Sequence, residues 1–174
     1  MFRTTTARPI LLKNYKKPNY SVSTVDLDFQ LHSTKTIVTS KVGYERAKGV
    51  KSGTSLILDG DGLTLVSIKM DGKVIDENRY IASADQLTLI DPPKQFELEI
   101  VTEVNPTANT ALSGLYRSSG NYCTQCEAQG FRRITYFLDR PDVLAVYTVR
   151  LEADQSEAPL LLSNGLTKHR RTQQ

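Results

Sequence analysis

The segment from Gln125 to Asp142 holds the densest group of side chains in this sequence that could do chemistry. The carboxylate of Glu127 stands next to the thiol of Cys126, and the amide of Gln125 lies two positions before it. Arginines, aromatic residues and aspartates follow in close order and end in a rigid Arg-Pro-Asp run. A loop that only keeps a protein in solution has no need of this mixture, so we expect a binding site here.

Glu127 could bind a cation such as an ammonium group, because a charge-assisted hydrogen bond strengthens when water is excluded. The competing interpretation is a solvated glutamate, or one that pairs with Arg132 or Arg133 of the same chain. If the segment is extended, Gln125 points to the same face as Glu127 and could donate or accept a hydrogen bond beside it. Residue chemistry alone leaves both interpretations open.

Five charged side chains follow Glu127, and their signs almost balance. They are Arg132, Arg133, Asp139, Arg140 and Asp142. This balance argues against an anion site and favours salt bridges and hydrogen bonds that fix the segment to a neighbouring surface. Pro141 has a fixed φ and favours extended geometry at the residue before it, so residues 138–143 are expected to form a stiff corner.

Cys123 and Cys126 form one Cys-Thr-Gln-Cys motif, for which three interpretations compete. A redox pair of the thioredoxin type needs a helix start after a strand in a βαβ unit, and no such pattern surrounds the motif. Half of a zinc site would need a second Cys or His pair, and His32 and His169 are not paired. We therefore expect reduced thiols in an intracellular protein, with no metal ligand or cofactor in this chain.

Apolar and polar residues alternate with a period of two through most of the chain, which predicts short β-strands. The expected strands cover residues 25–31, 35–44, 56–58, 63–70, 74–75, 80–82, 87–90, 96–100 and 144–152, with a short run at 160–162. Asp-Gly pairs at 59–60, 61–62 and 71–72 are typical turn signals, because glycine readily takes a positive φ.

Many short strands with frequent turns predict an antiparallel all-β fold, either a sandwich or an open saddle of sheets. The sequence has no convincing amphipathic helix. The longest region without strand alternation, residues 105–130, is rich in Asn, Thr, Ser and Gly. We expect it to be a functional loop that leads into the Glu127 segment.

Length and charge limit the possible functions. A chain of 174 residues is long enough for one domain with a core, and two domains are not expected. No apolar run approaches the ~20 residues of a membrane helix. The net charge is +3, and the basic residues gather at the two ends, so neither a nucleic-acid nor a membrane partner is expected. The start is acid-free and rich in threonine, faintly like an organelle transit peptide, but a cytoplasmic location is favoured.

Three motifs carry a resemblance to a known family. They are Leu-Ser-Gly-Leu-Tyr-Arg-Ser-Ser-Gly at 112–120, Cys-Thr-Gln-Cys-Glu-Ala-Gln-Gly-Phe-Arg-Arg at 123–133 and Tyr-Phe-Leu-Asp-Arg-Pro-Asp-Val at 136–143. Together with supporting matches at 13–20 and 161–165, they resemble the N-terminal domain of aminopeptidase N, a family of gluzincin-type zinc metallopeptidases. The likeness covers residues 11–165 and is strongest to the bacterial, plant and protozoan branch.

The resemblance implies an all-β, saddle-shaped domain that packs against a separate thermolysin-like catalytic domain. Glu127 matches the family's glutamate that helps to hold the free α-amino group of the peptide, and Gln125 matches the glutamine of the first-residue pocket. The candidates for the contact with the catalytic domain are Arg132, Arg133, Asp139, Arg140 and Asp142. The implied partners are therefore a peptide N-terminus and the catalytic domain.

The family's catalytic motifs, H-E-x-x-H with its second glutamate and the Gly-x-Met-Glu-Asn loop, do not occur in this sequence. The resemblance therefore implies a recognition domain with no catalytic residue of its own, inactive alone, with the zinc in an absent domain. We expect a flexible N-terminus at 1–12, the β domain at 13–165 and a non-matching basic tail at 166–174, as in a truncated product or fragment. The alternative hypothesis is a non-catalytic interaction or scaffold module of the same fold.

Overall fold

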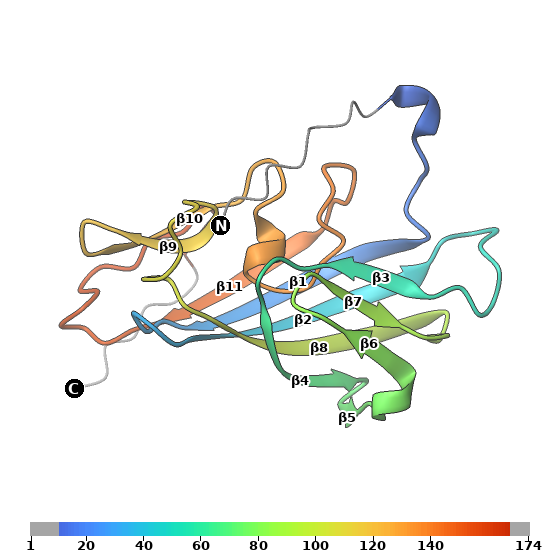
Figure 1. Ribbon diagram of the computed structural model, residues 1–174, viewed down its shortest axis with the longest axis horizontal. Helices are drawn as coiled ribbons and strands as arrows, with labels where there is room; N and C mark the ends of the chain where they lie inside the picture. The colour runs from blue at the N-terminus through green and yellow to red at the C-terminus, as the bar shows by residue number, and fades with distance from the viewer. Residues whose placement is uncertain (1–10, 168–174) are drawn as a thin grey trace.

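The computed structural model describes residues 11–167, in which eleven strands form three sheets and three short 3₁₀ turns are the only helices (Figure 1). This arrangement confirms the all-β prediction. Most of the expected flexible N-terminus, most of the expected basic tail, and His169 lie outside the described residues. None of the helices described between residues 11 and 167 has the length and apolar content that crossing a membrane requires.

The largest sheet has six strands in the order β11-β1-β2-β8-β4-β5. Their bounds are β1 Tyr20–Gln30, β2 Thr36–Arg46, β4 Thr64–Met70, β5 Lys73–Val74, β8 Gln95–Val104 and β11 Val146–Glu152. The pairings are antiparallel except that of β11 with β1, which is parallel. The tight β4–β5 turn at Asp71 and Gly72 has φ values of 50° and 75°, as the Asp-Gly signal predicts.

Two smaller sheets complete the domain. A three-stranded sheet has the order β3 (Leu56–Asp59), β7 (Gln86–Leu89) and β6 (Tyr80–Ala82), and a hairpin pairs β9 (Gly114–Ser118) with β10 (Asn121–Gln125). The 3₁₀ turns are η1 (Leu12–Asn14), η2 (Glu77–Arg79) and η3 (Phe131–Arg133). In Figure 1 the three-stranded sheet lies over the large sheet, and the hairpin stands to one side.

The core lies between one face of the large sheet and the three-stranded sheet. The period of two along each strand sends alternate side chains inward, so Val25, Val38 and Leu98 are buried while their neighbours face solvent. Leu58 and Leu87 of the smaller sheet are fully buried against them. Alternation therefore sets which face of each strand is inside.

The segment that follows η3 closes this core. Ile134 and Phe137 are buried, and their backbone is held from both sheets. The hydroxyl of Thr102 donates to the Ile134 carbonyl oxygen at 2.8 Å, and Phe137 exchanges two backbone hydrogen bonds with Asp59, at 2.8 and 3.0 Å. Buried polar groups that find partners in this way cost little to bury.

The expected loop at 105–130 is partly wrong, because it contains the hairpin β9–β10. Its turn residues Ser119 and Gly120 have φ values of 49° and 85°, the combination that a two-residue hairpin turn requires. The parallel partnership of β11 with β1 also departs from the antiparallel expectation, and the described structure has no strand at 160–162. A parallel pairing joins distant parts of the chain, so local alternation carries no signal for it.

β11 is an edge strand with unusual exposure. Val146, Tyr147 and Val149 are 70%, 47% and 38% exposed, and Leu144 just before the strand is 83% exposed. Natural edge strands are commonly protected by charges, proline or a covering element. β11 carries Arg150 and Glu152 in its second half, while the apolar side chains of its first half remain exposed.

Tyr44 is the buried polar side chain whose hydroxyl makes no hydrogen bond within the described residues. Its ring stacks on Phe96 with the centroids 5.6 Å apart, and burial raises its pKa far above the ordinary value. The hydroxyl therefore contributes a desolvation cost without a compensating bond.

Tyr44→Phe is expected to raise the free energy of unfolding by about 1 kcal/mol, because it removes a buried hydroxyl that has no partner. Tyr20 is the matched control, since its hydroxyl donates to the Thr54 carbonyl oxygen at 2.6 Å. Tyr20→Phe should lower the free energy of unfolding by about the same amount. Urea denaturation of both variants measures the difference, and clear destabilisation by Tyr44→Phe would contradict the prediction.

Candidate functional site

A tight turn joins β10 to η3 and carries Glu127. The Gly130 amide donates to the Cys126 carbonyl oxygen at 2.8 Å, and the Glu127–Ala128 peptide bond is cis. Gly130 is buried, and a Cβ there would lie 2.5 Å from the Gln125 carbonyl oxygen. The close approach requires glycine at this position, and the turn is folded tightly upon itself.

The carboxylate of Glu127 is exposed and pairs with no cation among residues 11–167. The two arginines that could have neutralised it bind other carboxylates. Arg132 binds Asp139, and Arg133 binds Asp61. Glu127 therefore does not pair with Arg132 or Arg133, and its exposed carboxylate fits both a solvated glutamate and one that binds a cation.

The contact of Arg132 with Asp139 is the most buried ion pair of the segment. The Arg132 Nε donates to Asp139 Oδ2 at 2.8 Å, the Arg132 backbone amide donates to the same oxygen at 3.2 Å, and Asp139 is only 7% exposed. The Arg132 Nη2 also donates to the Asp139 carbonyl oxygen at 2.9 Å and lies 3.6 Å from Asp59. This cluster fastens η3 to the closing segment and to β3.

Arg133 ties the other side of η3 to the loop between β3 and β4. Its Nη2 lies 2.6 Å from Asp61 Oδ2, and the Asp61 amide donates to the Arg132 carbonyl oxygen at 3.0 Å. Gly114 at the start of β9 packs against Arg133, where a Cβ would lie 2.5 Å from the arginine Cβ. η3 is thus the common support of the hairpin and the small sheet.

Arg140 and Asp142 form a separate corner, as the Arg-Pro-Asp run predicts. Arg140 donates to both carboxylate oxygens of Asp142, at 2.9 and 2.8 Å, and to the Lys16 carbonyl oxygen at 2.9 Å. The hydrogen bonds from Arg140 hold the pKa of Asp142 below its ordinary value. The Tyr15 hydroxyl donates to Asp142 at 2.8 Å, and this bond raises the pKa of the phenol. The corner holds the chain segment that precedes β1.

These contacts confirm that the charged residues after Glu127 fix the segment by salt bridges and hydrogen bonds. Arg132, Arg133 and Asp139 come together around η3, whereas Arg140 and Asp142 lie in the corner that binds Tyr15. Their expected role at an interface with another domain stays a prediction, since all five have partners in this chain.

Gln125 reaches Glu127 by a different geometry from the one expected. The strand ends at Gln125, and the turn begins before Glu127, so the two side chains do not share one face of an extended segment. The Gln125 Nε2 instead donates to the Glu127 carbonyl oxygen at 3.4 Å. Both residues are exposed, Gln125 at the end of β10 and Glu127 in the turn that follows.

Both cysteines are free thiols. Burial raises the pKa of Cys126, and the nearby carboxylate of Asp139 adds to the rise. A raised pKa disfavours the thiolate, the form that attacks disulfides and binds metals. Cys126 is partly buried and packs against the core, and its raised pKa disfavours reaction as a nucleophile.

The described residues do not fit a zinc ion. Between residues 11 and 167, no three His, Cys, Asp or Glu side chains are grouped so that they could hold a metal. The Nδ1 of His32 already accepts hydrogen bonds from the Thr34 and Lys35 backbone amides, at 3.3 and 3.2 Å.

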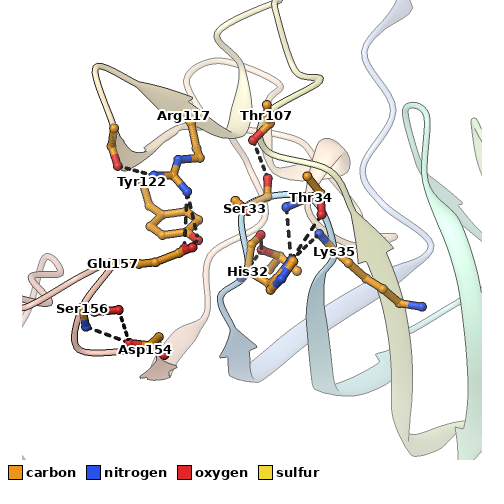
Figure 2. Close-up of polar contacts among 12 residues, drawn as sticks. His32, Ser33, Thr34, Lys35, Thr107, Arg117, Tyr122, Asp154, Ser156 and Glu157 are labelled. Carbon is orange, nitrogen blue, oxygen red and sulfur yellow. Dashed lines mark hydrogen bonds and ion pairs between the residues drawn. The ribbon is translucent and has the colours of Figure 1, made fainter.

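The sequence patterns missed the side chains that hold the hairpin in front of the turn. Arg117, Tyr122 and Glu157 form a cluster that joins β9, β10 and the loop after β11 (Figure 2). The Ser-Gly pair at 119–120 could have indicated the hairpin and hence the first two residues. Glu157 has no local signal, because only the fold brings it to the hairpin.

Comparison with known proteins places these features in a family. The family model described as Peptidase M1 N-terminal domain matches residues 14–174. The aminopeptidase N of Caulobacter vibrioides is 45% identical over 94% of this chain and 18% of its own length. That of Haemophilus influenzae is 46% identical over 88% of this chain and 18% of its own length. This chain thus spans about a fifth of these relatives.

A solved structure has the same fold. The crystal structure of Legionella pneumophila aminopeptidase A in complex with aspartic acid superposes with a TM-score of 0.81 and is 35% identical. The match covers 89% of this chain and 18% of that chain.

Asp139→Asn is expected to lower the free energy of unfolding by about 2 kcal/mol, because it removes the nearest anion of the half-buried Arg132 guanidinium and leaves it only the more distant Asp59. Asp142→Asn is the matched control, since its ion pair with Arg140 is more exposed and should contribute about 1 kcal/mol or less. Urea denaturation of the two variants gives both values. An equal loss of unfolding free energy in the two variants would show that burial does not make the Arg132–Asp139 pair more stabilising than the exposed Arg140–Asp142 pair.

Proposed function

The chain belongs to the Peptidase M1 N-terminal domain family, and we propose that it is the substrate-recognition domain of an aminopeptidase N-like zinc metallopeptidase. In this proposal the complete enzyme removes N-terminal residues from peptides, and this chain recognises the free amino end. The observation that carries the proposal is the exposed carboxylate of Glu127 on a tight turn, which pairs with no cation among residues 11–167 and lies close in sequence to arginines that are engaged elsewhere.

Glu127 would bind the ammonium group of a peptide through its negative charge. An ammonium has three N–H donors and needs acceptors, which a carboxylate supplies with a charge-assisted hydrogen bond. The attraction is weak in open water and grows when a partner surface excludes water. Such a carboxylate loses little on binding, because no salt bridge to a cation of the described residues must break first.

Gln125 would line the pocket for the first side chain of the peptide. Its amide lies at the end of β10 and already contacts the Glu127 backbone. The partner surface would be a catalytic domain outside this chain, which would hold the zinc and break the bond. We propose that the fixed segment from Arg132 to Asp142 presents its outer side to that domain. The two free thiols support a cytoplasmic setting.

Glu127→Gln tests the role in amine binding. Residues 14–174 of this chain replace the matching residues of the Caulobacter vibrioides relative, and kinetics are measured on aminoacyl and peptide substrates. Loss of the charge should raise KM by about tenfold or more, because hydrogen bonds to charged groups contribute ~1.5–3 kcal/mol. Glu77→Gln, at an exposed glutamate of η2, is the matched control and should leave KM unchanged.

The same experiment separates a second candidate, a non-catalytic interaction module. The exposed apolar edge of β11 favours this candidate, since such an edge accepts a further strand. An active chimera whose KM is indifferent to Glu127→Gln would remove Glu127 from amine recognition and favour the interaction module.

The isolated 174-residue chain is expected to be inactive on aminoacyl chromogenic substrates, with and without added zinc. The physical reason is that the described residues cannot assemble three metal ligands, so no metal-bound water can be formed by them. The active chimera, assayed at the same concentration, is the positive control. Robust turnover by the isolated chain would refute this part of the proposal.

A further inference from the structure

The hairpin β9–β10 stands apart from the two other sheets and leads directly into the Glu127 turn. A two-stranded hairpin is marginally stable in water and needs support from other parts of the protein. At its base, Gly114 packs against Arg133 of η3. β9 is held further by the buried side chain of Leu115 and by the hydrogen bond from the Arg117 amide to the Pro106 carbonyl oxygen at 3.1 Å, whereas β10, which leads into the turn, is paired with β9 alone in the described sheets.

The second support lies nearer the tip and consists of Arg117, Tyr122 and Glu157, which we call the clasp. The Tyr122 hydroxyl donates to Glu157 Oε2 at 2.8 Å, and the Arg117 Nη1 lies 3.4 Å from the same oxygen. The Arg117 guanidinium also lies over the Tyr122 ring, 4.7 Å from its centroid, and donates to the Gly120 carbonyl oxygen at 2.6 Å. Figure 2 shows both hairpin side chains directed at Glu157.

The clasp joins segments that are distant in sequence. Glu157 belongs to the loop that follows β11, and the backbone there is held by its own turn, in which the Glu157 amide donates to the Asp154 carbonyl oxygen at 3.1 Å. The Ser156 amide and hydroxyl both donate to the Asp154 carboxylate, at 2.7 and 2.6 Å. Glu157 is thus presented by an ordered loop and provides a fixed point for the hairpin.

We propose that the clasp positions the Glu127 carboxylate, with Arg117, Tyr122 and Glu157 as positioning residues for amine recognition. This inference rests on the proposed function. The contact with Glu157 adds a support on the side of β10 to those that hold β9, and it thereby helps to set the direction in which the turn after Gln125 leaves β10. A small error in that direction matters, because a displacement of about 1 Å in a binding group can weaken binding strongly.

The structural half of the inference is tested on the 174-residue chain by hydrogen–deuterium exchange. Tyr122→Phe removes only the hydroxyl that binds Glu157, and Glu157→Gln removes only the charge. Either change should speed amide exchange in residues 114–130 by about threefold to tenfold, with β1 and β2 unchanged. Tyr116→Phe, on β9 and outside the clasp, is the matched control and should have no effect.

A double variant identifies the contact as the cause. If Tyr122 and Glu157 act through the bond between them, Tyr122→Phe with Glu157→Gln should speed exchange little more than either change alone. Additive effects, or no effect of the single changes, would overturn the clasp as a unit.

The functional half is tested in the chimera. Tyr122→Phe should raise KM for free-amine substrates about threefold to tenfold with kcat nearly unchanged, because the anchor is displaced while the chemistry is not. Loss of folded protein would instead lower the apparent kcat at constant KM. A KM that responds to Glu127→Gln but not to Tyr122→Phe overturns the positioning role and leaves the proposed function standing. A KM that ignores Glu127→Gln overturns the proposed function, and with it the positioning role, even where exchange shows that the clasp supports the hairpin.

Discussion

The burial of residues 134–138 between the two larger sheets is the constraint on which the rest of the structure depends. Ser40 and Thr135 share a buried hydrogen bond of 2.9 Å, Thr102 donates to the Ile134 carbonyl oxygen, and Phe137 pairs with Asp59. These bonds satisfy the polar groups of a segment that must cross an apolar core. Because η3 comes directly before this segment, its place is set as well, and the Glu127 turn comes directly before η3.

Charge distribution follows from the same packing. Because η3 is fixed, Arg132 reaches Asp139 and Arg133 reaches Asp61, and each arginine forms an ion pair with its aspartate. Glu127 is left on the outer side without a partner among the described residues. The thiol of Cys126 packs against the core, and burial raises its pKa above the ordinary value. Glu127 and Cys126 are neighbours in the sequence, but Glu127 is exposed to solvent and Cys126 packs against the core.

The hairpin β9–β10 and the edge strand β11 show what local sequence patterns do not predict. Alternation and β-branched residues predicted the positions of β1, β2 and β8, because each depends on residues within one strand. The region before Glu127 is rich in polar residues, so its strands β9 and β10 carried little alternation and looked like a loop. β11 alternates well, yet neither its parallel pairing with β1 nor its edge position can be deduced from that pattern.

The sequence by itself determined the all-β class, most strand positions, the Asp-Gly turn at 71–72 and the segment in which the candidate site lies, because each depends on residues close together in the chain. Residue types also indicated that Arg132 and Asp139 would form salt bridges. Only the tertiary structure decided that Glu127 does not pair with Arg132 or Arg133, that Gln125 contacts its backbone at the turn, and that Glu157 supports the hairpin from 35 residues beyond Tyr122. The reason is physical: these contacts join segments that meet only when the sheets pack.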